Sequence, residues 1–368
     1  MRTINRVAVS IILACAGVGG CAVDMGEEML DVSSEALAAN EVVDAKGNVW
    51  VLNRKIEGKA APRLDANGRI EAFVPRSPDR DYSKMSDEEL AEVLRPKMAR
   101  NGYEYVLKHP DLELVRKIRE GRGAGVVGLP SEVLAAAEAP VEVLITPNVV
   151  IGTDSRELRR DNSFYPMSTQ VWNDWGCSGT LIGPSTMVTA AHCVHDGNDW
   201  FRWPVYRPGT DIQDVSPFAF GEFGCYDVTI PGGWDGSTVS EDYAVIEFSN
   251  CGAYPGNATG WLGFYATDSG GNISGRTSYI YGYPGDKAPY PQIWGIGNSS
   301  LSTSIWYPAR VFYSIDTFNG QSGSGVYQIR DSGRYVVAIH NGGYDSDENQ
   351  GRWLDVSVAN FIRAYSAL

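Results

Sequence analysis

The chain has 368 residues and a formal net charge of −14 at pH 7, with 31 Lys and Arg against 45 Asp and Glu residues. This length accommodates two or three domains. The acidic balance argues against a nucleic-acid-binding protein, because phosphate contacts need clustered Lys and Arg side chains. The 41 Gly, 19 Tyr and 10 Trp residues favour a turn-rich β protein and exclude collagen, a coiled coil and a polytopic membrane protein.

Residues 1–21 have the pattern of an export signal. Met1–Arg6 carries two arginines, and Val7–Val18 is almost wholly apolar but shorter than the ~20 residues of a spanning helix. Val18–Cys21 is similar to a lipoprotein signal, in which Cys21 would become the lipidated first residue. Ordinary signal-peptidase cleavage beside these small residues is the alternative. In either case we expect a secreted chain, extracellular or periplasmic, with no later segment that spans a bilayer.

Residues 22–148 and 149–368 differ in composition and are expected to form separate regions. The first region is charged and favours helices. A capping box at Ser86–Glu89 predicts a helix start, and Pro96 should end that helix. Leu112–Arg119 predicts a second short helix. A glycine-rich break and a strand are expected further on, at Gly121–Gly125 and Val141–Thr146.

The second region contains nine of the ten tryptophans and four of the six cysteines. Short β-branched or alternating runs recur between turn residues, which indicates an all-β sandwich or barrel. The predicted strands are Thr186–Thr189, Tyr243–Phe248, Thr277–Tyr281, Val326–Ile329 and Tyr335–His340. The pattern of Val356–Leu368 predicts a closing amphipathic helix.

Three segments of the second region carry side chains suited to nucleophilic catalysis. In chain order they are Thr189–Cys193 (TAAHC), Glu241–Ile246 (EDYAVI) and Asn319–Gly325 (NGQSGSG). Acyl transfer by serine needs a base, a carboxylate that orients the base, and donors for the oxyanion. His192, Asp242 and Ser322 are the candidates for the first two groups and for the nucleophile. Neighbouring glycines allow a tight turn that aims the N–H groups of Gly320 and Ser322 at one point.

These segments resemble the motifs of the chymotrypsin-like serine proteases, and four others resemble those of the V8-like bacterial glutamyl endopeptidases. The four are Val150–Asp154 (VIGTD), Cys177–Pro184 (CSGTLIGP), Gly282–Lys287 (GYPGDK) and Asp316–Thr317. The resemblance covers about residues 149–368, with the motifs in the family's order. It implies two six-stranded antiparallel β-barrels with the active site between them. The expected fold is therefore all-β with a C-terminal helix, preceded by a mixed, partly helical propeptide.

The resemblance implies that His192 is the general base, Asp242 its orienting group and Ser322 the nucleophile, with Gly320 and Ser322 as the oxyanion hole. An α/β-hydrolase is excluded, because it needs a GxSxG motif and the order Ser, Asp, His. Here Ser324 stands where the second glycine should be. An inactive pseudoprotease that serves as a binding module is the remote non-enzymatic alternative.

The four cysteines after the signal, Cys177, Cys193, Cys225 and Cys251, allow three disulfide pairings. The resemblance implies a Cys177–Cys193 bridge that holds the histidine loop, which leaves Cys225 to pair with Cys251. A zinc site is the alternative, but no CxxC or HxxxH spacing supports it.

The substrate pocket is expected to contain His340 and Thr317. In the V8-like enzymes, a histidine after the nucleophile and a threonine five residues before it bind a P1 carboxylate, which implies cleavage after Glu or Asp. An imidazolium suits a carboxylate ligand. Asp316 lies six residues before Ser322, where trypsins bind Lys or Arg, so basic P1 specificity is the alternative.

Residues 22–148 are expected to be the propeptide of a zymogen, with the mature protease, residues 149–368, starting near Val149 or Val150. In trypsins, an aspartate just before the nucleophile pairs with the new N-terminal amine. Gln321 occupies that position here and has no negative charge. The V8-like resemblance implies that this amine acts near the P1 carboxylate instead. A binding or adhesion module is the rival interpretation of residues 22–148. Expected partners are protein or peptide substrates and the chain's own propeptide, around a monomeric enzyme.

The remaining histidines, His109 and His195, are expected on the surface, the latter in a polar loop. No cofactor is expected. The acidic run Asp345–Asn349 is a candidate for structural calcium, but Gln350 and Val356 stand where an EF-hand needs glycine and glutamate. We therefore expect Asp345–Asn349 to form a solvated surface loop.

Overall fold

The computed structural model describes residues 40–59, 79–121, 126–131, 150, 153–304, 308–331, 333–344 and 348–368. The expected export signal with Cys21, the strand at Val141–Thr146, most of the Gly121–Gly125 break and most of the acidic run lie outside these residues. Residues 39–368 cluster as one unit, which is the unit considered below.

The described N-terminal region (residues 40–131) contains helices and strands. Its helices are α1 (Asp87–Leu94) and α2 (Leu112–Glu120), and its strands are β1 (Glu41–Val43), β2 (Val49–Lys55), β3 (Lys97–Arg100), β4 (Tyr103–Leu107) and β5 (Val126–Gly128). The capping box is present, because Glu89 N–H donates to Ser86 Oγ (3.1 Å) and Ser86 N–H to Glu89 Oε2 (2.7 Å). Helix α1 ends before Pro96, as expected, and α2 matches the second predicted helix.

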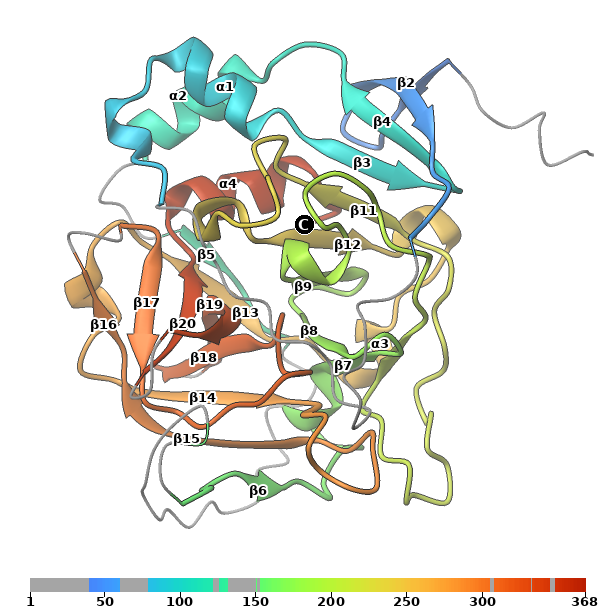
Figure 1. Cartoon of the computed structure of the whole chain (residues 1–368), viewed down its shortest axis with the longest axis vertical. Coiled ribbons are helices and arrows are strands. Elements are labelled where there is room, and N and C mark those ends of the chain that lie inside the picture. The colour runs from blue at the N-terminus through green and yellow to red at the C-terminus, as the bar shows by residue number, and fades with distance from the viewer. Residues whose placement is uncertain are drawn as a thin grey trace, which may run out of the picture. The chain divides into compact units, whose positions relative to one another are not determined.

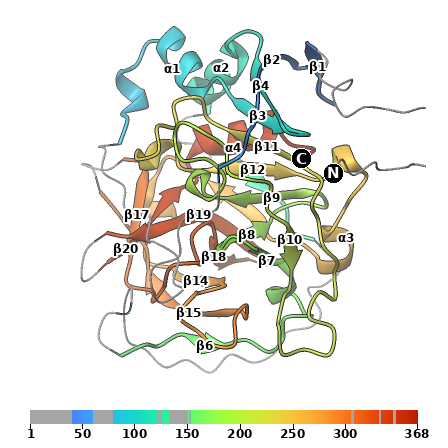
Figure 2. The same cartoon turned by 45° about the vertical axis from the view of Figure 1, so that its right-hand side comes forward.

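The first sheet has ten strands in the order β1-β2-β4-β3-β11-β12-β9-β8-β7-β10 (Figures 1 and 2). Its later strands are β7 (Gln170–Asn173), β8 (Cys177–Leu181), β9 (Thr186–Thr189), β10 (Tyr206–Pro208), β11 (Asp227–Ile230) and β12 (Ala244–Glu247). All its pairings are antiparallel. Strands from both expected regions therefore share one sheet.

The second sheet also has ten strands, with the path β16-β17-β20-β19-β18-β14-β15-β6. These are β6 (Glu157–Leu158), β14 (Thr277–Gly282), β15 (Trp294–Ser300), β16 (Ser302–Thr303), β17 (Arg310–Tyr313), β18 (Gly325–Arg330), β19 (Gly333–Gly343) and β20 (Asn349–Trp353). Off this path, β13 (Gly263–Ala266) pairs parallel with β19 and antiparallel with β5.

The five strands predicted in residues 149–368 all occur, within three residues at either end, as β9, β12, β14, β18 and β19. The C-terminal helix is α4 (Val356–Ala364), capped by Asp355, whose carboxylate accepts from Val358 N–H (3.0 Å). The structure differs from the expectation of two separate six-stranded barrels. Six strands of the first sheet come from residues 149–368, and four strands of the N-terminal region extend that sheet.

A single apolar cluster joins the N-terminal region to the rest of the described chain. The N-terminal region contributes Trp50, Leu94 and Ile118. The rest of the described chain contributes Tyr243, just before β12, and Phe361 on α4. Helix α4 lies below α1 and α2 in the view of Figure 1, and α2 packs against it. In the described residues, no helix is both long and apolar enough to span a membrane.

Candidate active site

His192 and Asp242 meet at neighbouring strands of the first sheet. His192 follows β9 in a single helical turn, and Asp242 precedes β12. Because Ala244 pairs with Thr189, the two segments emerge side by side. His192 Nδ1 lies 2.8 Å from Asp242 Oδ2, and His192 N–H donates to Oδ1 (2.9 Å). Asp242 is fully buried. Both carboxylate oxygens therefore hold the histidine, which leaves Nε2 as its reactive nitrogen.

Asn341, which the sequence analysis did not assign to the triad, supports Asp242 from the second sheet. Its amide Nδ2 donates to Asp242 Oδ2 (2.6 Å) and to the Asp242 carbonyl (2.9 Å). Its Oδ1 accepts from Arg352 N–H. The sequence signal was slight: a single amide side chain between His340 and two glycines. Asn341 links the two sheets at the candidate site.

Ser322 sits in a turn that requires glycine on both sides. Gly320 has φ +104° and Gly323 has φ +88°, a region that favours glycine. A Cβ atom at Gly320 would overlap the Tyr283 carbonyl, and one at Gly323 would overlap Thr189 and Ser178. The turn therefore packs directly against β8, the end of β9 and the start of the His192 segment.

The backbone around Ser322 leaves two donors for a ligand. The Gly320 carbonyl accepts from Ser178 Oγ (2.7 Å), and the Asn319 carbonyl accepts from Gly285 N–H (2.7 Å). Among the described residues, the N–H groups of Gly320 and Ser322 donate to no protein acceptor. With the flanking carbonyls engaged elsewhere, these N–H groups can serve an oxyanion.

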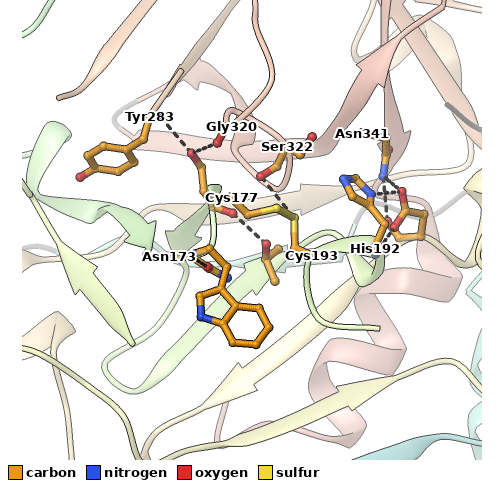
Figure 3. The surroundings of a disulfide bond; sticks show 12 residues. Asn173, Cys177, His192, Cys193, Tyr283, Gly320, Ser322 and Asn341 are labelled. Carbon is orange, nitrogen blue, oxygen red and sulfur yellow. Dashed lines mark hydrogen bonds and ion pairs between the residues drawn. A yellow bond between two sulfur atoms is a disulfide. The ribbon is translucent and has the colours of Figure 1, made fainter. Parts of the chain in front are cut away.

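Both expected disulfides are present, Cys177–Cys193 and Cys225–Cys251. Figure 3 shows the first bridge between the Ser322 turn and His192; Cys193 Sγ lies 3.6 Å from the Ser322 carbonyl oxygen. Cys177, His192 and Cys193 are close enough to suggest a metal site. Because the two sulfurs are bonded to each other, they offer no thiolate to a metal.

His340 lies on β19 next to the Ser322 turn. Gly323 N–H donates to its carbonyl (2.8 Å), and its ring is buried. Nδ1 lies 2.7 Å from the Tyr313 hydroxyl, which itself donates to the Gln350 carbonyl (2.7 Å). Nδ1 therefore carries the proton and Nε2 is left for a ligand. Burial lowers the His340 pKa to about 3, although the hydrogen bond with the Gln350 carbonyl opposes this shift.

Asp316 and Thr317, the other pocket candidates, are both buried. Asp316 Oδ2 accepts from the backbone N–H of Ser155 (2.8 Å) and from its hydroxyl. The carboxylate that would bind a basic P1 side chain is therefore engaged by the segment that follows the proposed mature N-terminus.

Arg156, which the sequence did not point to, contacts Gln321 in the Ser322 turn. Its buried guanidinium pairs with Asp154 and Asp286, and Nη1 lies 3.4 Å from Gln321 Oε1. Burial opposes the shift, but the hydrogen bonds from Arg156 and Lys287 lower the Asp154 pKa. The side-chain oxygen of Gln321 therefore accepts from a buried guanidinium, that of Arg156.

The surface position expected for His195 is wrong. Its ring is fully buried, packs edge-on against Trp200 with ring centroids 4.9 Å apart, and accepts from Gly197 N–H (2.9 Å). Burial lowers the His195 pKa to about 4. His109 is exposed, as expected. Of the four histidines, His192 and His340 lie at the candidate site.

Comparison with known proteins identifies the family to which this chain is similar. A family model described as Trypsin matches residues 154–363. A Bacillus subtilis protein named extracellular metalloprotease is 29% identical over 60% of this chain and 71% of its own length. A Bacillus licheniformis glutamyl endopeptidase is 30% identical over 64% and 74%. A solved structure of Glu endopeptidase in complex with MPD is 26% identical, with a TM-score of 0.49 over 58% of this chain and 98% of that one.

Proposed function

The chain belongs to the trypsin family of serine proteases, and we propose on that basis that it hydrolyses peptide bonds with His192, Asp242 and Ser322 as its catalytic triad. The observation that carries the proposal is the 2.8 Å contact between His192 Nδ1 and Asp242. A histidine held in this tautomer presents a basic Nε2 to the nucleophile.

In the proposed mechanism, Ser322 Oγ attacks the peptide carbonyl carbon while His192 Nε2 takes its proton. Asp242 stabilises the resulting imidazolium, and the Gly320 and Ser322 N–H groups bind the oxyanion, each contributing roughly 3–4 kcal/mol in comparable sites. Collapse of the tetrahedral intermediate breaks the C–N bond, and His192 protonates the leaving amine. Water, deprotonated by His192, then attacks the acyl-enzyme and releases the acid product and free Ser322.

The test of this chemistry is labelling with a fluorophosphonate probe. The processed wild-type chain should be labelled at Ser322, and Ser322→Ala should lose both labelling and turnover while it remains folded. A folded wild-type protein that neither reacts with the probe nor cleaves peptides would favour the inactive binding module instead.

For the substrate, we infer a preference for Glu or Asp at P1, bound by His340 and Thr317. Two observations support it. His340 Nε2 is left for a ligand, and Asp316 is engaged by Ser155. A relative is named glutamyl endopeptidase. A P1 carboxylate beside Nε2 favours the protonated imidazole, so substrate binding is coupled to proton uptake by His340.

Matched peptides that differ only at P1 (Glu, Asp, Lys, Arg, Phe) test the pocket. We expect cleavage after Glu, and loss of that preference in His340→Ala. Preferred cleavage after Lys or Arg would assign the pocket to Asp316 and support the trypsin-like alternative.

We further infer that the chain is exported as a zymogen and is cut before Val149 or Val150. The Bacillus subtilis relative, which is named extracellular metalloprotease, supports export. Ser155, five residues after Val150, is anchored at Asp316, and five extended residues span roughly 17 Å, so the freed amine has the reach to act in the P1 pocket. The uncut chain from residue 22 should be nearly inactive. Equal activity before and after the cut would disprove this role of the amine.

A further inference from the structure

Strand β3 of the N-terminal region continues the first sheet at β11 (Figure 1). The pairing is antiparallel, with Ala99 opposite Val228 and Met98 opposite Thr229. In the described part of the chain, β3 is the strand that occupies this side of β11. Removal of β3 would expose a row of unpaired backbone N–H and C=O groups on β11. Such an edge can pair with other chains and promote aggregation, so folded proteins usually protect it.

The N-terminal region also supplies part of the hydrophobic core. Trp50, which is 1% exposed, packs against Tyr365 with ring centroids 5.7 Å apart. The Tyr365 hydroxyl donates to Asp111 Oδ2 (3.1 Å), and α2 packs on α4. Separation of the N-terminal region would therefore expose Tyr365 and the apolar side of α4 to water.

Buried ion pairs connect the two regions as well. Arg100 Nε lies 2.8 Å from Asp227 Oδ1 on β11, and Arg310 Nε lies 2.7 Å from Asp79 Oδ1. The Asp79 side chain is fully buried and that of Arg310 is 5% exposed. A buried charge that loses its partner is strongly unfavourable, so these pairs oppose separation.

The N-terminal region reaches the residue next to the catalytic aspartate. Arg80 Nε lies 3.2 Å from Glu241 Oε2, and the Tyr82 hydroxyl lies 2.9 Å from Glu241 Oε1. The same hydroxyl lies 3.2 Å from the Ser240 carbonyl. Arg80 and Tyr82 thus brace the turn that carries Asp242.

We propose that residues 40–121 stay bound to residues 149–368 after the maturation cut, so that the mature protease is a non-covalent complex of two chains. The inference rests on the proposed function, which places a cut before Val149 or Val150. A segment that only shielded the active site would contact the protease surface, whereas this one completes its first sheet and its core. The cut frees the new amine and leaves the brace behind Asp242 in place.

The test uses the chain from residue 22 with Ser322→Ala, which removes self-digestion, and with a recognition sequence for an unrelated site-specific protease directly before Val149. After complete cleavage, size-exclusion chromatography in native buffer should give one peak that contains both fragments on a denaturing gel. The fragments should separate only in denaturant. Elution of the two fragments in separate peaks without denaturant would overturn the proposal.

Two further variants test which contacts retain the segment. Arg100→Ala removes the cation that pairs with Asp227 on β11 and leaves that carboxylate, among the described residues, only the hydrogen bond from Asn250. This variant should speed dissociation roughly tenfold or more. Lys84→Ala removes a cation of the same region whose side chain is 83% exposed, and should dissociate like the parent. Equal dissociation of both variants would overturn the assignment to the β3–β11 interface. Because the tested chain is inactive by design, failure of the proposed cleavage or P1 specificity would leave these results unchanged.

Discussion

The side-chain amide of Asn341 makes two hydrogen bonds to Asp242, one to Oδ2 (2.6 Å) and one to the backbone carbonyl (2.9 Å). The same Oδ2 atom lies 2.8 Å from His192 Nδ1. The carboxylate is thus fixed from the second sheet while it holds a histidine of the first. Asn341 is therefore a positioning residue for the proposed triad.

Asn341→Ala should lower kcat by roughly 10–100-fold, because a hydrogen bond to a charged group contributes about 1.5–3 kcal/mol. The KM of a good peptide substrate should change little, because Asn341 acts through Asp242 and not on the substrate. Gln328→Ala is the control, since it removes a buried amide on β18 that donates to Ile273 and Ser278. Equal kcat losses in both variants would argue for a general structural effect.

Gly320→Ala should abolish measurable turnover. An added Cβ would overlap the Tyr283 carbonyl and displace the N–H group proposed to bind the oxyanion. Gly252→Ala is the matched control, because Gly252 also has a positive φ (+69°) but has no atom within 4 Å of the added Cβ. The control should lose about 1 kcal/mol of stability and keep its kcat. Steady-state kinetics and urea unfolding of both variants decide the matter, and an active Gly320→Ala enzyme would contradict the assignment.

The two disulfides should have different effects when they are removed as pairs. Each closes a short loop, of 16 and 26 residues, so either double Cys→Ser variant should lose roughly 3 kcal/mol of unfolding free energy. Only the Cys177/Cys193 variant should also lose turnover, because Cys193 adjoins His192 and contacts Ser322. The measurements are chemical denaturation and kcat at a temperature where both variants are folded. A parallel loss of kcat in the Cys225/Cys251 variant would refute the distinction.

Glu241 should make the stability of the uncut chain decrease with rising pH. Burial raises its pKa from 4.5 to about 7, so between these values the folded state holds a proton that the unfolded state has released. The Glu241 contribution is therefore complete below pH 4.5 and is lost as the pH rises through 7, by about 3 kcal/mol. Urea unfolding of the Ser322→Ala chain with and without an added Glu241→Gln substitution isolates this contribution, because His195 and His340 titrate alike in both chains. The unfolding free energy of the chain that keeps Glu241 should fall relative to that of the Glu241→Gln chain as the pH rises from 4.5 to 7. Parallel profiles would contradict it.

The proposed pocket predicts a second pH effect. His340 is neutral in the free protein, since burial lowers its pKa to about 3, and a P1 carboxylate should raise that pKa. The ratio of kcat/KM for a Glu peptide to that for the matching Gln peptide should therefore fall as the pH rises above 7. The ratio removes every pH effect that the two peptides share, and a ratio that does not change with pH would count against His340.

Local signals in the sequence proved reliable. The capping box at Ser86 and Glu89 gave the start of α1, and alternation predicted β14 and β18. The cysteine pairings also follow the resemblance. The addition of β3 to β11 was not predictable in this way, because a pairing between segments more than 120 residues apart leaves no local pattern. His195 was misjudged for a related reason: its loop is polar in sequence, and the burial comes from Trp200 and from Trp234, which donates to the His195 carbonyl (2.9 Å).

The hydrogen bond from Gly323 N–H to the His340 carbonyl joins the turn of the proposed nucleophile to the strand of the proposed P1 residue through backbone atoms alone. A change of side chain at position 340 therefore leaves this bond in place. Substrate preference can therefore change by point substitution while the catalytic turn keeps its geometry. A lineage can acquire a new cleavage preference without an inactive intermediate. Insertions and deletions between the two positions would shift the bond itself, and purifying selection should remove them.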